Sequence, residues 1–435
     1  MELNPEQLRV VERIMEHARE TAPDPIVVIG PGGSGKTTSV MDAVMQLLKD
    51  DKKVLLCAPT HKAVEVLIET ASAAGLASNP NLGFSTLHAA LGLALLPTDE
   101  RMSIAKMGEG SLHNYDYIVI DECSMLGKFV VETILSSEIY TFGHRVLFMG
   151  DAMQVFPVRE SESPVFSLYE VQALKRVERF DGESGIADVT TKLRDAILSH
   201  RKFNYAVEDS ESLRGLPAKP FKDEVCAVFA DHDVNPLTDA RVMAWRNSTV
   251  DAHNKRIRAA RYGKHADPYV VGELLLAGRT IGDKKAPFAH VDQPLRVVAC
   301  ERNACYQWSK NPDDCFTVDK VVVETLDGKH QHMTNVVCAE GDLAFTVELT
   351  RLRRLAMSDR TYWPDYYRFL EAFDDLRYPY CTTVHKAQGS TYDRAYVDVG
   401  DIVSNNKLAE KLRLLYVACS RPRHQLILNT RNIRA

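Results

Sequence analysis

The sequence predicts an α/β protein built on two parallel β-sheets, with a smaller, mainly β segment inserted into the second half. Three observations predict this fold class. Short β-branched runs alternate with helical stretches over residues 25–158, and a second alternation begins near Arg241 and resumes at Tyr380. Residues 267–378, between them, contain short strands with charged turns. Strands that alternate regularly with helices favour parallel sheets.

The first alternation contains four strand-like runs, each ending in a cluster of residues that can do chemistry. They read IVVIG, VLLCAPT, YIVIDE and RVLFMGD, with helices expected from the first run to Leu48 and from the second through Ala74. In open α/β sheets, ligands bind at the carboxyl ends of the strands. We therefore expect the active site along that edge.

Bulk composition describes a globular protein without a strongly basic character. The 435 residues are 45% hydrophobic, enough for two or three domains, and the 53 basic and 59 acidic side chains give a net charge of -6. Any nucleic acid must therefore bind in a local groove. No long apolar run or leader-like opening occurs, which predicts a cytoplasmic protein. The nine cysteines are odd in number and irregularly spaced, so we expect free thiols and no disulfide.

A phosphate-binding loop is the strongest single motif. The residues GPGGSGKT follow the strand IVVIG and precede a helix, the context in which GxxxxGK[ST] binds phosphates through backbone N–H groups at a helix N-terminus. We expect Lys36 to contact the β and γ phosphates of ATP and Thr37 to contact Mg²⁺. The expected nucleotide-binding residues of the loop are Gly32, Gly33, Ser34, Gly35, Lys36, Thr37 and Thr38.

Two further clusters complete the expected ATPase site. Asp121 and Glu122 follow the strand YIVI, and such a pair can hold Mg²⁺, through Asp121, and orient the attacking water. Alone, the pair could be two exposed acidic residues without a function, but a phosphate-binding loop upstream favours a catalytic role. Gln154 follows Gly150-Asp151 at the end of RVLFMGD, where its amide could sense the γ-phosphate; a simple turn is the alternative.

With CTTVHKAQGST at 381–391 and YVACSR at 416–421, these clusters resemble the ordered motif set of superfamily 1 helicases along nearly the whole chain. DECSM at 121–125 is similar to the RecD-like branch, superfamily 1B, and the segments LNPEQ and ARVMAWRNSTVDAHN resemble the Dda-type helicases of T4-type phages. The resemblance implies two RecA-like P-loop domains and an SH3-like insert. Their expected extents are 1–172 for the first domain, with a hairpin at 90–112, 173–266 and 379–435 for the second, and 267–378 for the insert.

The resemblance also implies roles by position. Gln7 matches a glutamine that reads adenine, Arg421 matches an arginine finger, and Gly389 matches a glycine that approaches the nucleotide closely. Arg179 matches an arginine that reaches the γ-phosphate from the second domain, with Arg176 as the alternative. The expected catalytic residues are Lys36, Asp121, Glu122, Gln154, Arg179 and Arg421.

Small hydroxyls and imidazoles after three strands predict a nucleic-acid track. Such groups make phosphate contacts that carry no sequence information. Ordinary loop capping is the alternative for each cluster, but all three match strand-contact motifs of the resembled family. The expected contacts are Pro59, Thr60, His61, Thr86, His88, Asn247, Thr382, Thr383, His385 and Lys386.

Residues 91–111 resemble the hairpin pin that splits the duplex in this branch; a surface hairpin with no role is the alternative. Aromatic residues of the insert could stack on bases, although core packing is the more common reading. They are Trp308, Trp363, Tyr366 and Tyr367. Six residues of the insert could suggest zinc, but they lack a paired CxxC. These are Cys300, Cys305, Cys315, His330, His332 and Cys338.

Together the motifs and the resemblance predict an ATP-dependent DNA helicase that uses ATP and Mg²⁺, acts as a monomer and unwinds duplex DNA. The resemblance implies 5′ to 3′ movement, and host-cell cytoplasm if the protein is phage-encoded. Expected partners are single-stranded DNA and duplex junctions, with a single-strand-binding protein or replisome proteins as further candidates. A superfamily 1 RNA helicase is one alternative. A nucleic-acid-binding scaffold with a degenerate ATPase is another, although Lys36, Asp121, Glu122 and Arg421 are intact.

Overall fold

A computed structural model describes most of the chain, and its contacts divide it into two units. The described residues are 3–21, 24–98, 101–106, 108–136, 144–157, 160, 162–175, 184–283, 286–308 and 315–435, with backbone alone at 94–98 and 101–106. The first unit comprises Met1–Leu93, Lys106–Ile257 and Tyr380–Ala435, and the second comprises Ala94–Ala105 and Arg258–Pro379. Among the described helices, none is both long and apolar enough to cross a lipid bilayer.

The N-terminal half of the first unit is built on a six-stranded, all-parallel sheet in the order β3-β2-β6-β7-β1-β8. The four predicted strands are confirmed as β1 (Ile26–Ile29), β2 (Val54–Ala58), β6 (Tyr117–Ile120) and β7 (Arg145–Gly150). β3 (Leu82–Thr86) is the strand expected before His88, and β8 (Glu170–Ala173) was not predicted. Both lie at the edges of the sheet, where a strand needs fewer apolar residues.

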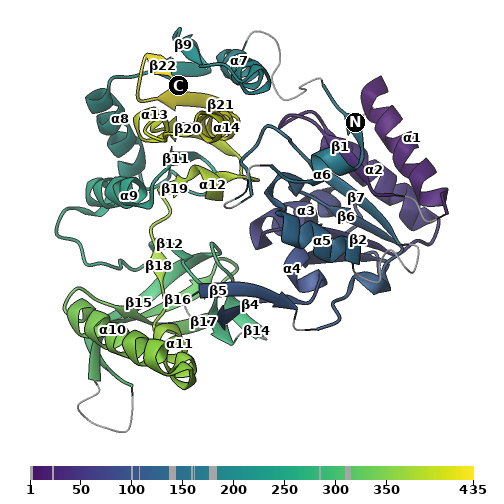
Figure 1. Ribbon diagram of the computed structural model, residues 1–435. Coiled ribbons are helices and arrows are strands. Elements are labelled where there is room, and N and C mark those ends of the chain that lie inside the picture. Colours follow the sequence, from purple (N-terminus) through teal and green to yellow (C-terminus); the bar gives the residue numbers. More distant parts are fainter. Residues whose placement is uncertain are drawn as a thin grey trace. The chain divides into compact units, whose positions relative to one another are not determined.

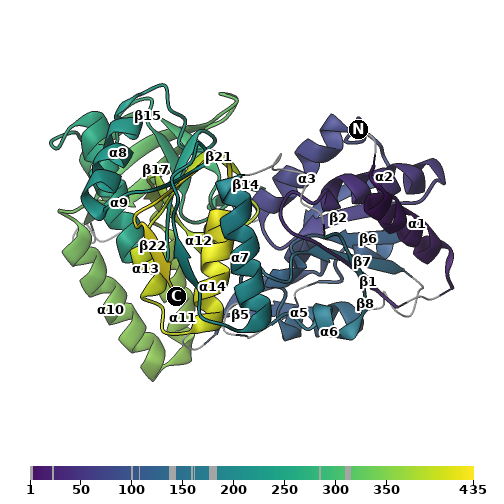
Figure 2. The same ribbon diagram turned by 90° about the horizontal axis from the view of Figure 1, so that it is seen from above.

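Helices cover both faces of this sheet, as Figure 1 shows. In Figure 2, α1, α2 and α3 lie on one side of the strands and α5 and α6 lie on the other. Val28, Leu56 and Leu147 pack in one core cluster with the first three helices, because alternate side chains of a strand point to the same face. The helices are α1 (Pro5–Arg19), α2 (Lys36–Lys49), α3 (His61–Ala73), α4 (Leu87–Ala90), α5 (Lys128–Ser136) and α6 (Val165–Leu168), with 3-10 turns η1 (Leu112–Asn114) and η2 (Cys123–Met125).

The C-terminal half of the first unit holds the second predicted parallel sheet, in the order β10-β21-β20-β11-β19. Figure 2 shows α8 and α9 on one side of it and α7 and α14 on the other. The segment LLYVACS lies in α14, which packs against α7 in the core of this half. The strands are β10 (Leu213–Gly215), β11 (Ala240–Ala244), β19 (Cys381–Thr383), β20 (Tyr392–Val397) and β21 (Pro422–Leu428), with a separate ribbon of β9 (Asn204–Ala206) and β22 (Asn432–Arg434). The helices are α7 (Gly185–Ser199), α8 (Ala218–Ala230), α9 (Asn247–Tyr262), α12 (Val384–Ala387), α13 (Val399–Val403) and α14 (Leu408–Cys419).

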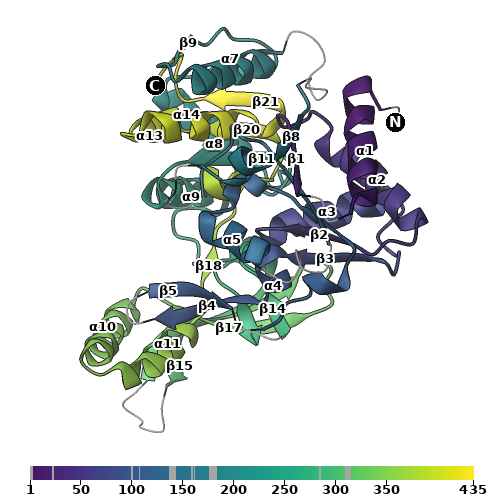
Figure 3. The ribbon, with the colours of Figure 1, turned by 45° about the vertical axis from the view of Figure 1, so that its right-hand side comes forward.

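The second unit contains the predicted β insert, an antiparallel sheet in the order β17-β16-β15-β12-β18. Two helices that were not predicted, α10 and α11, follow it, and β4 and β5 pair with each other in the same unit, as Figure 3 shows. An SH3-like character of the insert stays a prediction. The elements are β4 (Leu93–Thr98), β5 (Arg101–Lys106), β12 (Leu274–Ala277), β13 (Ile281–Asp283), β14 (Ala286–Ala289), β15 (Pro294–Gln307), β16 (Cys315–Thr325), β17 (Gln331–Val337), α10 (Asp342–Ser358), η3 (Arg360–Tyr362), α11 (Trp363–Glu371) and β18 (Leu376–Arg377).

The expectation of no disulfide was wrong. Cys305 and Cys315 are joined, and the seven other cysteines are free thiols. The bonded residues lie on neighbouring strands, β15 and β16, where Gln307 pairs with Cys315. Strand pairing brings these two sulfur atoms together, and neither the count nor the spacing of cysteines reports strand pairing.

Candidate ATPase site and nucleic-acid track

The phosphate-binding loop connects β1 to α2, as predicted, and its conformation depends on glycine. Gly33 and Gly35 have φ values of 82° and 80°, a left-handed conformation that glycine adopts at little cost. A Cβ atom at Gly35 would lie 2.1 Å from Gln7 Nε2. The loop therefore folds tightly at the N-terminus of α2, where the helix dipole favours phosphate.

Gln7 connects this loop to the start of α1. Its Nε2 donates to Ser34 O at 3.3 Å, and its Oε1 accepts from Asn4 N at 2.9 Å. Asn4 caps the same helix in return, which completes a reciprocal capping box. Gln7 thus lies against the nucleotide loop, while the predicted contact with adenine stays a prediction.

Lys36 lies inside the loop. Its Nζ donates to Gly30 O at 2.7 Å and to Pro31 O at 3.0 Å. Ser34 Oγ is buried and has no hydrogen-bond partner among the described residues. An ammonium group, an unpaired hydroxyl and the helix N–H groups suit a polyphosphate. Thr37 is half-buried and Thr38 is exposed on the first turn of α2.

The acidic pair stands at the carboxyl end of β6. Asp121 Oδ1 accepts from Glu122 N at 2.7 Å, and desolvation together with the negative charge of Glu122 raises the pKa of Asp121, while Lys36 opposes the rise. A nearby cation would stabilise the ionised form. The oxygen ligands of Asp121 and Thr37 are those that Mg²⁺ prefers, so the residues fit this ion.

Glu122 adopts an unusual backbone conformation and meets a residue that was not predicted. Its φ of 52° lies in the left-handed region, which costs energy for a residue with a side chain. Gln388 Nε2 donates to Glu122 Oε2 and to Ser124 Oγ, both at 3.1 Å. Gly389, which has a φ of 76°, faces the same carboxylate, since a Cβ atom there would lie 3.6 Å from Glu122 Oε1.

The loop after β7 is held by α14. Tyr416 OH donates to Asp151 Oδ2 at 2.6 Å, and Arg413 Nη1 donates to the carbonyls of Ala152 and, at 2.9 Å, Gln154. Gln154 itself is 5% exposed. Sequence reasoning found this loop but missed Arg413 and Tyr416, because their partners lie more than 250 residues away in the chain.

Arg421 follows α14 and faces the phosphate-binding loop. A Cβ atom at Gly32 would lie 4.0 Å from Arg421 Nη2. The guanidinium is oriented by Val417 O, 3.0 Å from Nε, and by Ser420 Oγ, 2.8 Å from Nη2. The structure therefore brings Arg421 beside the loop that carries Lys36. Arg179 and its alternative Arg176 lie outside the described residues.

Three threonines of the predicted track cap helices. Thr60, Thr86 and Thr383 accept backbone N–H bonds at the starts of α3, α4 and α12, as the capping alternative predicted. A hydroxyl that accepts such a bond still has its own hydrogen to donate to a phosphate. The capping role and the predicted track are therefore compatible.

The two halves of the first unit repeat one arrangement. Thr86 and Thr383 each end a strand and begin a short helix, and His88 and His385 follow two residues later. Burial lowers the pKa of both imidazoles, so at neutral pH they would contact phosphate as hydrogen-bond donors without adding charge.

The other predicted track residues differ in exposure. His61, Lys386 and Asn247 are exposed, and Thr382 is 6% exposed within β19. Directly after β2, Pro59 is half-buried and Thr60 is exposed. Because Thr382 is buried, little of its side chain is accessible for contact with a nucleic-acid strand.

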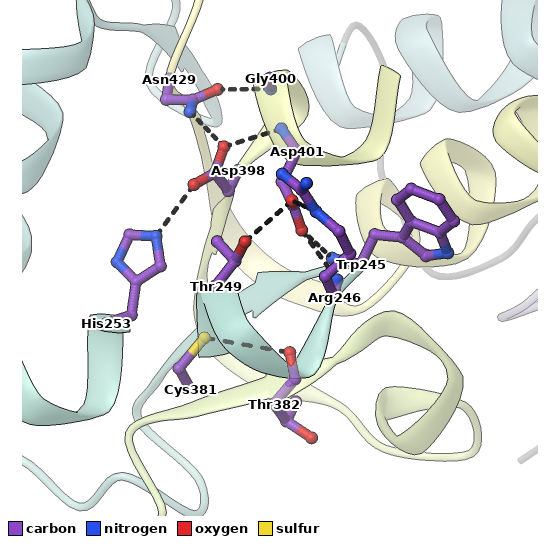
Figure 4. Close-up of polar contacts among 10 residues, drawn as sticks. All are labelled: Trp245, Arg246, Thr249, His253, Cys381, Thr382, Asp398, Gly400, Asp401 and Asn429. Carbon is purple, nitrogen blue, oxygen red and sulfur yellow. Dashed lines mark hydrogen bonds and ion pairs between the residues drawn. The ribbon is translucent and has the colours of Figure 1, made fainter. Parts of the chain in front are cut away.

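A buried carboxylate fixes the turn that precedes Asn247 (Figure 4). Asp401, whose side chain is 2% exposed, accepts from Trp245 N and Arg246 N, both at 2.8 Å, and from Thr249 Oγ1 at 2.9 Å. Arg246 Nε adds an ion pair at 2.6 Å. Asn247, the first residue of α9, therefore follows a constrained turn at the carboxyl edge of the second sheet.

The aromatic residues of the insert favour the core reading. Trp308 and Tyr366 pack against the cluster around Phe369, and Trp363 is 7% exposed. Two of the six candidate zinc residues form the disulfide, and His332 stacks on Phe288. Within the described ranges, no group of three or more His, Cys, Asp or Glu is placed to hold a metal ion.

The chain is similar to known proteins along its length. Residues 14–160 match the family described as an AAA domain, and residues 378–429 match the family described as a UvrD-like helicase C-terminal domain. Uncharacterized protein R530 of Acanthamoeba polyphaga mimivirus is 23% identical over 489 residues, covering 97% of this chain and 99% of that protein. The ATP-dependent DNA helicase dda of Enterobacteria phage T4 is 23% identical over 428 residues, covering 92% of this chain and 93% of that protein.

Among solved structures, the Pif1 helicase from Candida albicans has a TM-score of 0.50 at 14% sequence identity, covering 98% of this chain and 94% of that one. This likeness concerns the fold. The two parallel sheets, each with helices on both faces, are two RecA-like domains, here called the first and second domains.

Proposed function

Since this chain belongs to the superfamily 1B helicases and is related to the Dda helicase, we propose that it is an ATP-dependent DNA helicase that moves along single-stranded DNA and unwinds duplexes. One observation carries the proposal beyond the family relation. Arg421 of the second domain lies beside Gly32 of the phosphate-binding loop of the first. Nucleotide bound there would contact both domains, which is the requirement for converting hydrolysis into movement.

Each residue of the site has a role in hydrolysis. Lys36 binds the β and γ phosphates, and Glu122 orients the attacking water and takes its proton as the water oxygen bonds to the γ-phosphorus and the bridging P–O bond breaks. Arg421 neutralises the charge that develops on the transferred group. Asp121 and Thr37 would hold Mg²⁺, which supplies further neutralisation of the phosphates.

Movement requires that the two domains hold the strand in turn. Thr86 and Thr383 occupy equivalent positions in the two domains, so each domain offers one capped helix N-terminus to a phosphate. Contacts of α14 with the loop after β7 connect Arg421 to the first domain. We propose that nucleotide-dependent closure changes the spacing of the two contacts, that the protein works as a monomer on DNA junctions, and that single-strand-binding or replisome proteins are its partners.

The β4–β5 hairpin is the proposed pin. Its tip, at residues 99 and 100, lies outside the described residues. Replacing residues 97–100 by Gly-Gly is expected to leave DNA-stimulated ATPase and translocation nearly unchanged while unwinding falls steeply, because only a rigid obstacle at the junction obliges the complementary strand to leave. The measurement compares translocation and unwinding on the shortened variant. Survival of both activities would place the pin elsewhere, and collapse of both would show that the hairpin is needed for the folded motor and not for strand separation alone.

Unwinding of tailed duplexes tests the proposed function. We expect DNA duplexes with a 5′ tail to be unwound in an ATP- and Mg²⁺-dependent reaction and those with a 3′ tail to remain paired. Matched RNA duplexes test the alternative of an RNA helicase. Absence of ATP hydrolysis with any strand would instead support a nucleic-acid-binding scaffold.

A further inference from the structure

Gln388 of the second domain reaches the catalytic pair of the first. Its side chain is buried, with the residue 9% exposed, and its Nε2 donates to Glu122 Oε2 and Ser124 Oγ, both at 3.1 Å. Ser124 is also buried, at 3% exposed. A hydrogen bond that is shielded from water holds its geometry more strictly than an exposed one.

Gln388 is supported by the same short helix that carries part of the track. It stands at the C-terminal end of α12, whose other end is capped by Thr383. Val384 and Ala387 are fully buried in the core of the second domain, so this single turn moves as one piece with that core. A phosphate contact at Thr383 and the hydrogen bond at Gln388 therefore share one rigid support.

The carboxylate of Glu122 depends on its neighbours for its orientation. Its backbone is left-handed, and one oxygen, Oε2, accepts from Gln388. The other oxygen, Oε1, faces Gly389, which carries no side chain. The amide thus determines which carboxylate oxygen is held and which is turned toward Gly389.

We propose that Gln388 is a positioning residue that couples strand binding at α12 to ATP hydrolysis through the carboxylate of Glu122. The inference rests on the proposed function and deepens it. A strand bound at Thr383 fixes α12, the fixed helix holds the amide of Gln388, and the amide holds the proposed base in line with its water. Orientation of a general base acts on turnover and leaves the binding of ATP unchanged.

Variants of Gln388 test this coupling. Gln388→Ala is expected to lower strand-stimulated kcat about tenfold, with the KM for ATP and the affinity for single-stranded DNA within about twofold of the wild type. Gln388→Glu keeps the size of the side chain but replaces the donor by a carboxylate that repels Glu122. It should lose as much turnover as Gln388→Ala or more. Turnover of Gln388→Glu close to that of the wild type would show that the donated hydrogen bond is not needed, and that result would overturn the proposal.

Gln425→Ala is the matched control, because it removes a glutamine amide of the same domain that donates to Glu211 O at 3.5 Å and has no contact with the catalytic pair. Its stimulated turnover should stay within about twofold of the wild type. A double-mutant cycle with Glu122→Gln gives a second test: Gln388→Ala should have little further effect in that background, and an undiminished tenfold effect would overturn the coupling. Wild-type protein without any strand-stimulated ATPase would count against the proposed function itself, whereas normal stimulation in Gln388→Ala would reject the coupling alone.

Discussion

Lys36→Ala is expected to abolish ATP hydrolysis while single-stranded DNA still binds with nearly the wild-type affinity. Lys36 Nζ lies within the phosphate-binding loop, bonded to the carbonyls of Gly30 and Pro31, and these residues belong to the loop and not to the predicted track. Loss of one preorganised charge that stabilises the transferred phosphoryl group costs on the order of 10²- to 10³-fold in turnover. Steady-state ATPase with saturating DNA measures the first effect, and fluorescence anisotropy of a labelled strand measures the second.

Lys49→Ala is the matched control for this experiment. Lys49 is exposed in the last turn of the same helix, α2, so its removal changes the charge of the helix by the same amount without touching the loop. It should leave both measurements unchanged. A loss of strand binding in Lys36→Ala as large as the loss of hydrolysis would contradict the division between nucleotide site and track.

Local sequence patterns predicted those elements that are specified by their own residues. β1 and β6 are runs of apolar, mostly β-branched residues that are largely buried in the sheet, and a pattern of this kind is visible in a single segment. β8, with the sequence EVQA, is largely exposed and joins the sheet through pairing with β1. Its strand conformation depends on a partner that lies far away in the chain, so its own residues did not predict it.

The site divides in the same way. The phosphate-binding loop and the acidic pair are contiguous segments, so their residues could be named from spacing alone. The contact between Gln388 and Glu122 joins residues 266 positions apart, and no local pattern reports it. The family resemblance pointed to Gly389 in this segment. Its neighbour Gln388 is the residue that donates to the Glu122 carboxylate. In the structure, the sign of this contact is a polar side chain buried beside a predicted motif. The sequence alone does not show which polar side chains are buried.

Arg421→Ala is expected to lower turnover by about 10³-fold or more while the affinity for ATP changes little. Its guanidinium is held by Val417 O and by Ser420 Oγ and faces Gly32. The Ser420 hydroxyl accepts the bond from Nη2 at 2.8 Å. Because the charge on the transferred group is greatest in the transition state, an arginine directed at that group acts mainly on kcat. Single-turnover hydrolysis and equilibrium binding of a fluorescent ATP analogue separate the two quantities.

Two further variants define what a loss at Arg421 means. Arg423→Ala removes an exposed guanidinium two residues away that pairs with Asp393, and it should hydrolyse ATP like the wild type. Arg421→Lys keeps the charge but not the planar fork, so it should recover only a small part of the lost activity. Equal losses in ATP affinity and turnover for Arg421→Ala would reject its role as a finger. Full activity of Arg421→Lys would show that charge alone suffices and that the orientation given by Val417 and Ser420 has no catalytic consequence.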